Sequence, residues 1–274
     1  MFLFEIFLTA IVAAFFFIFF SLSKKTASND REWNPDQKIL TTAEFKKDGK
    51  VLVRNVRNIS YQTPTSYVIE YNDREYDIHA IETVWFILEP FNGYIGAAHT
   101  FLSFEFKDDV FVSISVEIRK KNTEKYSASK GLFREYELMY VVADERDVIK
   151  LRSNHRKNKV FMYPLKIKKE EAQKLFLDML TRANEIEKKP EFYNTLSNAC
   201  ATNIVRHINK VIEKPLPWTD YRIFIPEHLD VYFQKNRLLG ISLPFHEAKE
   251  KHLINPLAEK YADDPHFSQR IRGR

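Results

Sequence analysis

The sequence has one cysteine and six glycines among its 274 residues. One cysteine cannot close an internal disulfide, which excludes a disulfide-stapled scaffold. So few glycines exclude collagen-like and glycine-rich repeats. The motifs GxxxxGKS/T, GxGxxG, HExxH, CxxC and GxSxG are absent as well. P-loop nucleotide hydrolysis, zincin chemistry and an α/β-hydrolase serine site therefore lack their usual signatures.

Neither sign of charge dominates, with 42 Lys and Arg against 37 Asp and Glu. Basic runs interleaved with aromatic residues are missing apart from the short KKNTEKY stretch, so nucleic-acid binding is unsupported. The spacing of His, Asp and Glu does not supply the three or four converging ligands of a metal site. We therefore expect no nucleic-acid partner, no metal and no cofactor.

What is present is typical of a folded chain with an appendage. Hydrophobic residues make up 45% of the sequence, which excludes an intrinsically disordered chain. Residues 2–22, FLFEIFLTAIVAAFFFIFFSL, carry Glu5 as their only charge. About 20 apolar residues span a bilayer as a helix, so this run predicts a transmembrane signal-anchor or a signal peptide. The alternative is a buried core helix, which would normally show a polar stripe.

The charges around this run leave its orientation open. Lys24 and Lys25 follow the run and no Lys or Arg precedes it. The positive-inside rule would place these lysines and the main domain in the cytosol, whereas a secretory signal has the opposite charge order. No small-residue cleavage site follows, which favours an uncleaved anchor in the inner membrane.

The remaining sequence predicts an α+β fold, an antiparallel sheet with packed helices. Residues 99–106 and 110–119 alternate with period 2 around an acidic turn and predict a hairpin. Residues 168–188 predict an amphipathic helix, and a second helix starts close to Cys200, capped by Ser197 or Asn198. Further strands are expected at 51–61, 65–72, 75–88, 133–143 and 159–167, with a helix or irregular connection at 145–157. The predicted organisation is an anchor at 1–22, a polar tether at 23–36, the α+β domain at 37–240 and a C-terminal tail at 241–274 with a short helix and a disordered end.

Cys200 is the most informative single residue. It lies in a polar context, NTLSNACATN, at a predicted helix start. A helix N-terminus lowers the pKa of a thiol and offers backbone N–H groups to an oxyanion, which favours a nucleophile. The alternative is a small buried hydrophobe, the usual state of a free cysteine.

A cysteine nucleophile needs a base and a group that orients the base. His99 begins a predicted strand after a loop with two glycines, and Glu117 lies on the next strand, on one face with Ser115. A carboxylate at that position can accept the imidazole N–H. The alternatives are a structural histidine and an ordinary salt bridge from Glu117 to Arg119 or another arginine.

Several motifs together resemble the Lnb N-terminal periplasmic domain family. They are HTFLSFEF, SISVEIRK, GLFREYEL, ADERDVIKLR, FYNTLSNAC and IFIPEHLD, spread in order from about Trp33 to Gly240. The resemblance implies an exported domain of the bacterial envelope, with the main domain in the periplasm. Together with the apolar run at residues 2–22, this predicts a protein with a single membrane pass. One departure is Asn198-Ala199-Cys200-Ala201-Thr202, where the family usually has Asn-Asn-Cys-Thr-Thr.

The order histidine, carboxylate, cysteine is also similar, more distantly, to circularly permuted papain-like cysteine enzymes of the NlpC type. That similarity implies a papain-like fold with Cys200 as nucleophile, His99 as base and Glu117 as orienting acid. Substrate-binding or supporting roles are expected for Asn198, Tyr193, Ser103, Arg119, Arg146 and Arg152.

Two functions follow from these observations. The first is a membrane-tethered cysteine hydrolase or acyltransferase that acts on an amide, ester or thioester of an envelope component, such as a peptidoglycan peptide, a lipid acyl group or a protein. The second is a non-catalytic envelope assembly or chaperone module that retains a papain-like shape.

Overall fold

The computed structural model describes residues 4, 7, 24–125, 127 and 130–274. The predicted anchor at residues 2–22 lies outside these residues except for Phe4 and Phe7. Among the residues that the structure describes, no helix is both long and apolar enough to cross a bilayer.

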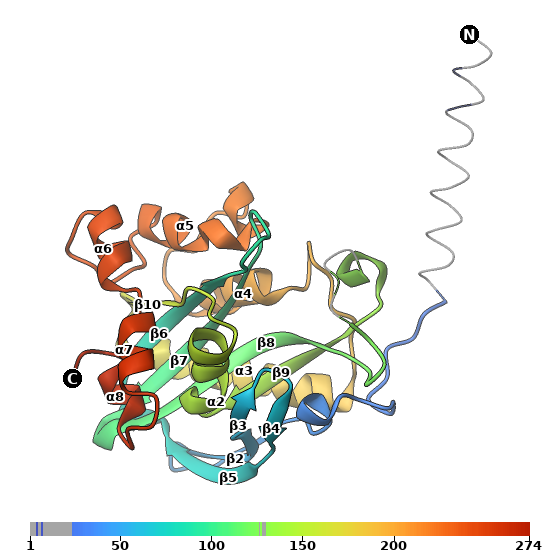
Figure 1. Cartoon of the computed structure of the whole chain (residues 1–274), viewed down its shortest axis with the longest axis horizontal. Helices are drawn as coiled ribbons and strands as arrows, with labels where there is room; N and C mark the ends of the chain where they lie inside the picture. The colour runs from blue at the N-terminus through green and yellow to red at the C-terminus, as the bar shows by residue number, and fades with distance from the viewer. Residues whose placement is uncertain (1–3, 5–6, 8–23, 126, 128–129) are drawn as a thin grey trace.

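A large, mainly antiparallel sheet forms the centre of the molecule (Figure 1). Within the described residues it has eight strands in the order β1-β2-β9-β8-β7-β6-β10, with β5 paired to β2. Its one parallel contact in this part of the chain joins β2 to β9 through Arg57 and Ala143. The strands are β1 (Thr42–Phe45), β2 (Lys50–Arg57), β5 (Tyr71–Asp77), β6 (Ile81–Pro90), β7 (Ala98–Phe106), β8 (Val110–Arg119), β9 (Glu137–Ala143) and β10 (Phe161–Pro164), and a separate hairpin has β3 (Ser60–Thr63) and β4 (Ser66–Val68).

The helices confirm the α+β class. Among the described residues they are α2 (Glu145–Lys150), α3 (Lys169–Lys188), α4 (Cys200–Val211), α5 (Leu229–Lys235), α6 (Phe245–Lys251), α7 (Asn255–Lys260) and α8 (Phe267–Arg270). A π-helical turn, η5 (Leu151–His155), continues α2. Short 3-10 turns lie at η1 (Pro35–Gln37), η2 (Ile78–Ala80), η3 (Lys107–Asp109), η4 (Lys130–Phe133), η6 (Tyr221–Ile223) and η7 (Pro226–His228).

The period-2 alternation of the strands gives the sheet two buried faces. On β7, Leu102 and Phe104 belong to the core formed with α3 and α4, whereas Phe101 belongs to the core formed with α2, α7 and α8. Successive side chains of a strand point to opposite faces, so helices can cover both. The predicted amphipathic helix is α3, which buries Phe176 and Met179 against the first face.

The predicted hairpin is β7–β8, and its two strands part at one end. Their pairing runs from Phe106 opposite Val110 to Phe101 opposite Ser115 and stops there. Beyond that point β7 stays paired with β6 as far as Ala98, while β8 stays paired with β9. This opening lies where the sequence places His99 and Glu117.

The C-terminal tail differs from its prediction. Residues 241–274 hold α6, α7 and α8, and Phe267 and Ile271 are buried in the second core. Arg272 is also buried, with its guanidinium 2.6 Å from the Glu145 carboxylate and 4.2 Å from the Phe111 ring centroid. The expected disordered end is therefore wrong, because apolar contacts and buried ion pairs hold these short helices to the sheet.

The polar stretch predicted as a tether also contacts the domain from Lys24 onward. Trp33 is buried, and the Arg119 guanidinium lies 4.2 Å from the centroid of its ring. Arg119 also donates hydrogen bonds to the carbonyls of Gln37 and Lys38. These contacts attach residues 33–38 to the end of β8.

Candidate functional site

A chain of hydrogen bonds crosses the opening between β7 and β8. His99 Nε2 lies 2.7 Å from Ser115 Oγ, and Ser115 donates to Glu117 Oε1 over 2.9 Å. A hydroxyl has one proton, and here Glu117 receives it, so Nε2 of the neutral imidazole is the donor to Ser115. This assignment leaves His99 Nδ1 unprotonated and able to accept a proton.

Arg152 fixes the carboxylate end of this chain. It lies in the π-helical turn η5, a type of turn frequent at functional sites. Its Nη2 donates to Glu117 Oε1 over 2.9 Å, and its Nε lies 2.8 Å from Glu89 on β6, opposite His99. The guanidinium also lies 5.0 Å from the Phe101 ring centroid. Arg152 is therefore the centre of a compact, largely buried cluster, in which it contacts the Glu89 and Glu117 carboxylates directly and the His99 imidazole joins through Ser115.

The surroundings keep the imidazole neutral and the carboxylate charged. Burial and the Arg152 cation lower the pKa of His99 to about 3. Burial acts to raise the pKa of Glu117, but Arg152 and His99 outweigh it and hold this pKa well below its usual range. At neutral pH the site thus holds a Glu117 carboxylate and an uncharged His99.

Cys200 is the first residue of α4, as the sequence predicts, but the cap differs. The N-cap is Ala199, which has no side chain able to cap, rather than Ser197 or Asn198. Thr202 compensates, because its hydroxyl accepts the Ala199 N–H over 2.9 Å. The helix then packs on β7 and β8, which brings Cys200 to the end of the sheet where these strands part.

The Cys200 thiol lies against Thr100, the residue after His99. Burial raises the pKa of the thiol, and the backbone N–H and hydroxyl of Thr100 and the N–H of Ala201 offset this in part. Thr100 and His99 are consecutive on β7, so their side chains leave the strand on opposite faces. In this described part of the chain, Cys200 makes no hydrogen bond to His99. At rest the site therefore has a neutral thiol and a neutral imidazole on opposite faces of the start of β7.

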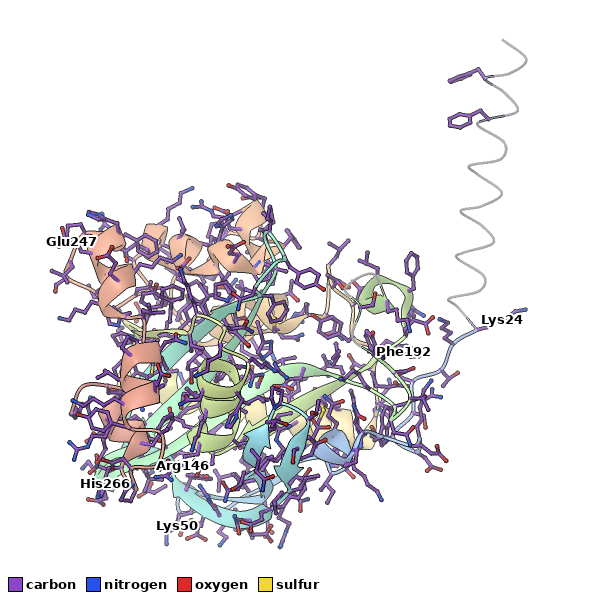
Figure 2. All side chains as sticks on the ribbon, viewed as in Figure 1. Lys24, Lys50, Arg146, Phe192, Glu247 and His266 are labelled. Atoms are coloured by element: carbon purple, nitrogen blue, oxygen red, sulfur yellow. The ribbon has the colours of Figure 1, made fainter. Side chains whose placement is uncertain are left out.

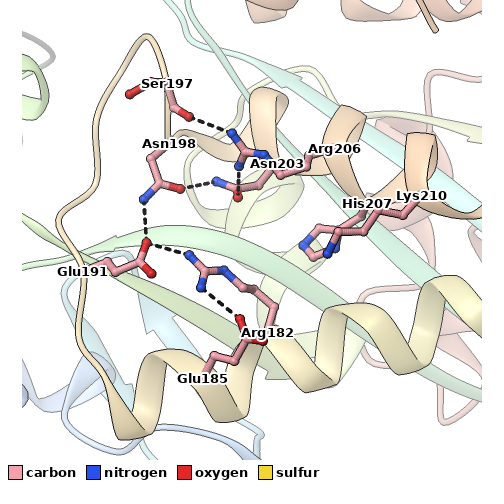
Figure 3. A pocket seen from close by; sticks show the side chains of 9 residues that line it. All are labelled: Arg182, Glu185, Glu191, Ser197, Asn198, Asn203, Arg206, His207 and Lys210. Atoms are coloured by element: carbon pink, nitrogen blue, oxygen red, sulfur yellow. Dashed lines mark hydrogen bonds and ion pairs between the residues drawn. The ribbon is translucent and has the colours of Figure 1, made fainter. Parts of the chain in front are cut away.

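The loop before Cys200 borders a polar pocket of about 360 Å³ (Figure 3). Asn198 donates to the Phe192 carbonyl over 3.0 Å and accepts from the Asn203 amide over 3.0 Å. These bonds hold the loop that leads into Cys200. The pocket is lined by Arg182, Glu185, Glu191, Ser197, Asn198, Asn203, Arg206, His207 and Lys210.

The other predicted supporting residues lie apart from the His99 chain. Ser103 is buried and donates to the Glu145 carboxylate over 2.5 Å. Arg146 reaches the backbone of Asp264 in the C-terminal segment, and Arg119 holds residues 29–38. Tyr193 packs beside Gly131 in the loop region ahead of Cys200. Of these six supporting predictions, only Arg152 touches the His99–Glu117 chain.

Sequence reasoning missed two residues of the site, Glu89 and Thr100, and a separate buried cluster around His207. Glu89 and Thr100 carry no motif, although the β6–β7 pairing alone would have placed Glu89 opposite His99. His207 is buried, with Nδ1 2.5 Å from Asp178 and Nε2 2.7 Å from the Tyr140 hydroxyl. Its position on the inner side of α4, three residues after Ile204, was a usable signal.

Comparison with known proteins gives one match. The family model of the Lnb N-terminal periplasmic domain matches residues 67–227, more than half of the chain, and this range includes His99, Glu117 and Cys200. No curated protein and no solved structure matches the chain. The chain belongs to the Lnb N-terminal periplasmic domain family.

Proposed function

We propose that this protein is an envelope cysteine hydrolase or acyltransferase that acts on an amide, ester or thioester through Cys200, His99 and Glu117. Membership in a periplasmic domain family supports an envelope-associated protein with its main domain in the periplasm. The observation that carries the catalytic proposal is the largely buried chain from His99 to Arg152, whose His99 end is next in β7 to Thr100, the residue against which the Cys200 thiol lies. Clusters of titratable groups with shifted pKa values are typical of active sites.

In the proposed reaction the Cys200 sulfur attacks the acyl carbon. The thiol proton passes to His99 Nδ1 as the sulfur–carbon bond forms, because the resting thiol and imidazole are both neutral. Since the thiol and the imidazole lie on opposite faces of β7 at rest, this transfer takes place around the start of the strand and requires the two side chains to move together. The N–H groups of Ala201 and Thr100, which lie near the sulfur, are the candidate oxyanion donors. The imidazolium then protonates the leaving group as the acyl bond breaks. Water or an acceptor nucleophile resolves the thioester and restores the thiol.

Ser115 and Glu117 have orienting roles in this proposal. Ser115 accepts the Nε2–H of His99, and Glu117 accepts the hydroxyl proton of Ser115, which leaves Nδ1 as the basic atom. The Glu117 carboxylate also stabilises the imidazolium formed during attack. The helix start packed on the strand that carries the histidine is the feature that supports a papain-like arrangement.

The proposal includes a single membrane pass. Residues 2–22 serve as an inner-membrane anchor, and the domain that follows acts on a periplasmic peptide, lipid or protein acyl group. The length and composition of this run support the anchor.

Acyl transfer to the sole cysteine tests the proposal. The full chain in detergent is incubated with the butyryl thioester of N-acetylcysteamine and analysed by intact mass. We expect one butyryl adduct, sensitive to hydroxylamine, absent in Cys200→Ala and at least tenfold slower in His99→Ala. His246→Ala is the matched control, because His246 is exposed in α6. An adduct that forms equally fast in both histidine variants would contradict the proposal.

The alternative is a non-catalytic envelope assembly or chaperone module. The observation that favours it is the lack of a hydrogen bond between Cys200 and His99 in the described structure, together with the raised thiol pKa. This alternative predicts no adduct on Cys200 under conditions where free cysteine is acylated.

A further inference from the structure

Large apolar side chains are exposed at the loop that leads into His99. The β6–β7 connection carries Tyr94 and Ile95, and Ile95 is fully exposed. The segment that contains Tyr221, also exposed, is attached to this loop, because Gly96 N–H donates to Glu227 over 2.5 Å. Soluble surfaces seldom gather aromatic and aliphatic side chains at loop tips without a partner.

A second apolar cluster lies at the loop that leads into Cys200. Leu132 and Phe133 are exposed in η4, and Leu196 is exposed in the neighbouring loop. The two loops are joined, because the Asn194 amide donates to the Leu132 carbonyl over 3.4 Å. We call Tyr94, Ile95, Leu132, Phe133, Leu196 and Tyr221 the apolar rim.

The start of the described chain lies at this rim. The Lys25 ammonium donates to the Phe133 carbonyl over 3.0 Å and pairs with the Glu135 carboxylate. The apolar run of residues 2–22 ends three residues before Lys25. A membrane that holds this run is therefore within a few residues along the chain of Lys25, and Lys25 contacts Phe133.

The loops of the rim project in one direction. In Figure 1 the loop at 94–95 extends toward the top of the molecule, and the loop at 194–197 and the turn η4 lie to its right, all away from β5 and α8. Figure 2 shows Lys24 at the right and Lys50 at the lower edge. The two halves of the rim thus flank the end of the sheet where β7 begins and α4 starts.

We infer that the apolar rim is a second membrane contact, which docks the domain on the phospholipid bilayer that holds the N-terminal anchor. Tyrosines at a bilayer surface place their rings at the headgroup level, and the aliphatic tips enter the acyl boundary. Docking in this way orients the Cys200 and His99 end of the sheet toward the membrane. The inference rests on the proposed anchor and is independent of whether Cys200 reacts.

Nitroxide depth measurements test the inference on the full chain. Single cysteines are placed at Ile95, Phe133 and Lys50 in a Cys200→Ser background, spin-labelled and reconstituted into vesicles of phosphatidylethanolamine and phosphatidylglycerol. We expect the labels at Ile95 and Phe133 to collide more often with oxygen than with a water-soluble nickel chelate, and the label at Lys50 to show the reverse. Unfolded variants are recognised from their circular dichroism, and the neighbouring sites Tyr94 and Leu132 replace them.

The outcomes separate the rim from the anchor. Co-flotation with vesicles together with nickel-accessible labels at Ile95 or Phe133 would overturn the rim alone. Failure of the full chain to float with the vesicles would overturn both the anchor and the rim. Membrane-depth signals at both loops, with Lys50 in water, would establish the contact whatever the acylation assay shows.

Discussion

Arg152 is the residue on which the buried charges of the site converge. Its guanidinium contacts Glu117 and Glu89, both largely buried, and its pKa is raised because these carboxylates outweigh the effect of burial. A buried carboxylate without its cation is costly, whereas an exposed ion pair contributes little. The two situations can be compared within this chain.

Arg152→Met is expected to lower the free energy of unfolding by about 3–5 kcal/mol, because it removes the cation that pairs with Glu117 and the nearer of the two that pair with Glu89. Arg54→Met is the control, since Arg54 is half exposed and pairs with Asp73 at the surface, and its loss is expected to be below about 1 kcal/mol. Urea unfolding at pH 7 measures both. Equal losses in the two variants would contradict the buried network.

His99 should make stability depend on pH. Its pKa is about 3 in the folded protein and about 6.5 when unfolded, so the unfolded chain binds more protons between these values. The contribution of His99 to the free energy of unfolding is therefore complete above pH 6.5. It is lost as the pH drops from 6.5 toward 3, by at most about 1.4 kcal/mol per pH unit. His99→Gln should flatten this slope in urea titrations from pH 7 to 5. An unchanged slope would mean that His99 titrates normally in the fold.

At the scale of elements, sequence patterns predicted long periodic segments better than short ones. The 20 residues of α3 and the β7–β8 hairpin follow clear periodicities, and both were found. The cap of α4 was missed, because Asn198, a good capping residue, is used to hold the preceding loop instead. Helices α6, α7 and α8 have four to seven residues each, too few for a periodic signal.

The unusual cap of α4 gives a prediction at this scale. Ala199→Ser supplies a hydroxyl to the free N–H groups of the first turn and should stabilise the protein by about 1 kcal/mol. Ser197→Ala removes one of the two caps that the sequence predicts, but the Ser197 hydroxyl donates to Asn194 within the exposed loop and its removal should cost less than about 0.5 kcal/mol. Thermal unfolding of both variants decides between the two caps, and a larger effect at Ser197 would reject Ala199 as the cap.

For the whole molecule, the sequence indicated the fold class, the family and three of the residues now joined at one strand end, His99, Glu117 and Arg152. It could not place Cys200 on the far side of β7 from His99, because that depends on how α4 packs on the sheet. It also missed the closure of the second core by the C-terminal segment. That closure depends on contacts between residues more than a hundred positions apart, such as Arg272 with Glu145.

The C-terminal segment is predicted to be integral to the fold. Arg272→Met should lower the free energy of unfolding by about 3–5 kcal/mol, since it leaves Glu145 buried without its cation. Arg270→Met, two residues earlier and partly exposed beside Asp264, should cost less than about 1 kcal/mol. Urea unfolding of the full chain measures the difference. A mobile tail would make the two variants alike.

The pH profile of Cys200 acylation tests the central proposal most directly. Single-turnover rates with the butyryl thioester of N-acetylcysteamine are measured from pH 5 to 8 for the full chain, His99→Ala and His246→Ala. An imidazole with a pKa near 3 stays unprotonated over this range, so base-assisted attack by the neutral thiol predicts a nearly flat profile that falls at least tenfold in His99→Ala alone. A rate that climbs about tenfold per pH unit and is the same in all three proteins would show unassisted thiolate chemistry and contradict the Cys200–His99 site.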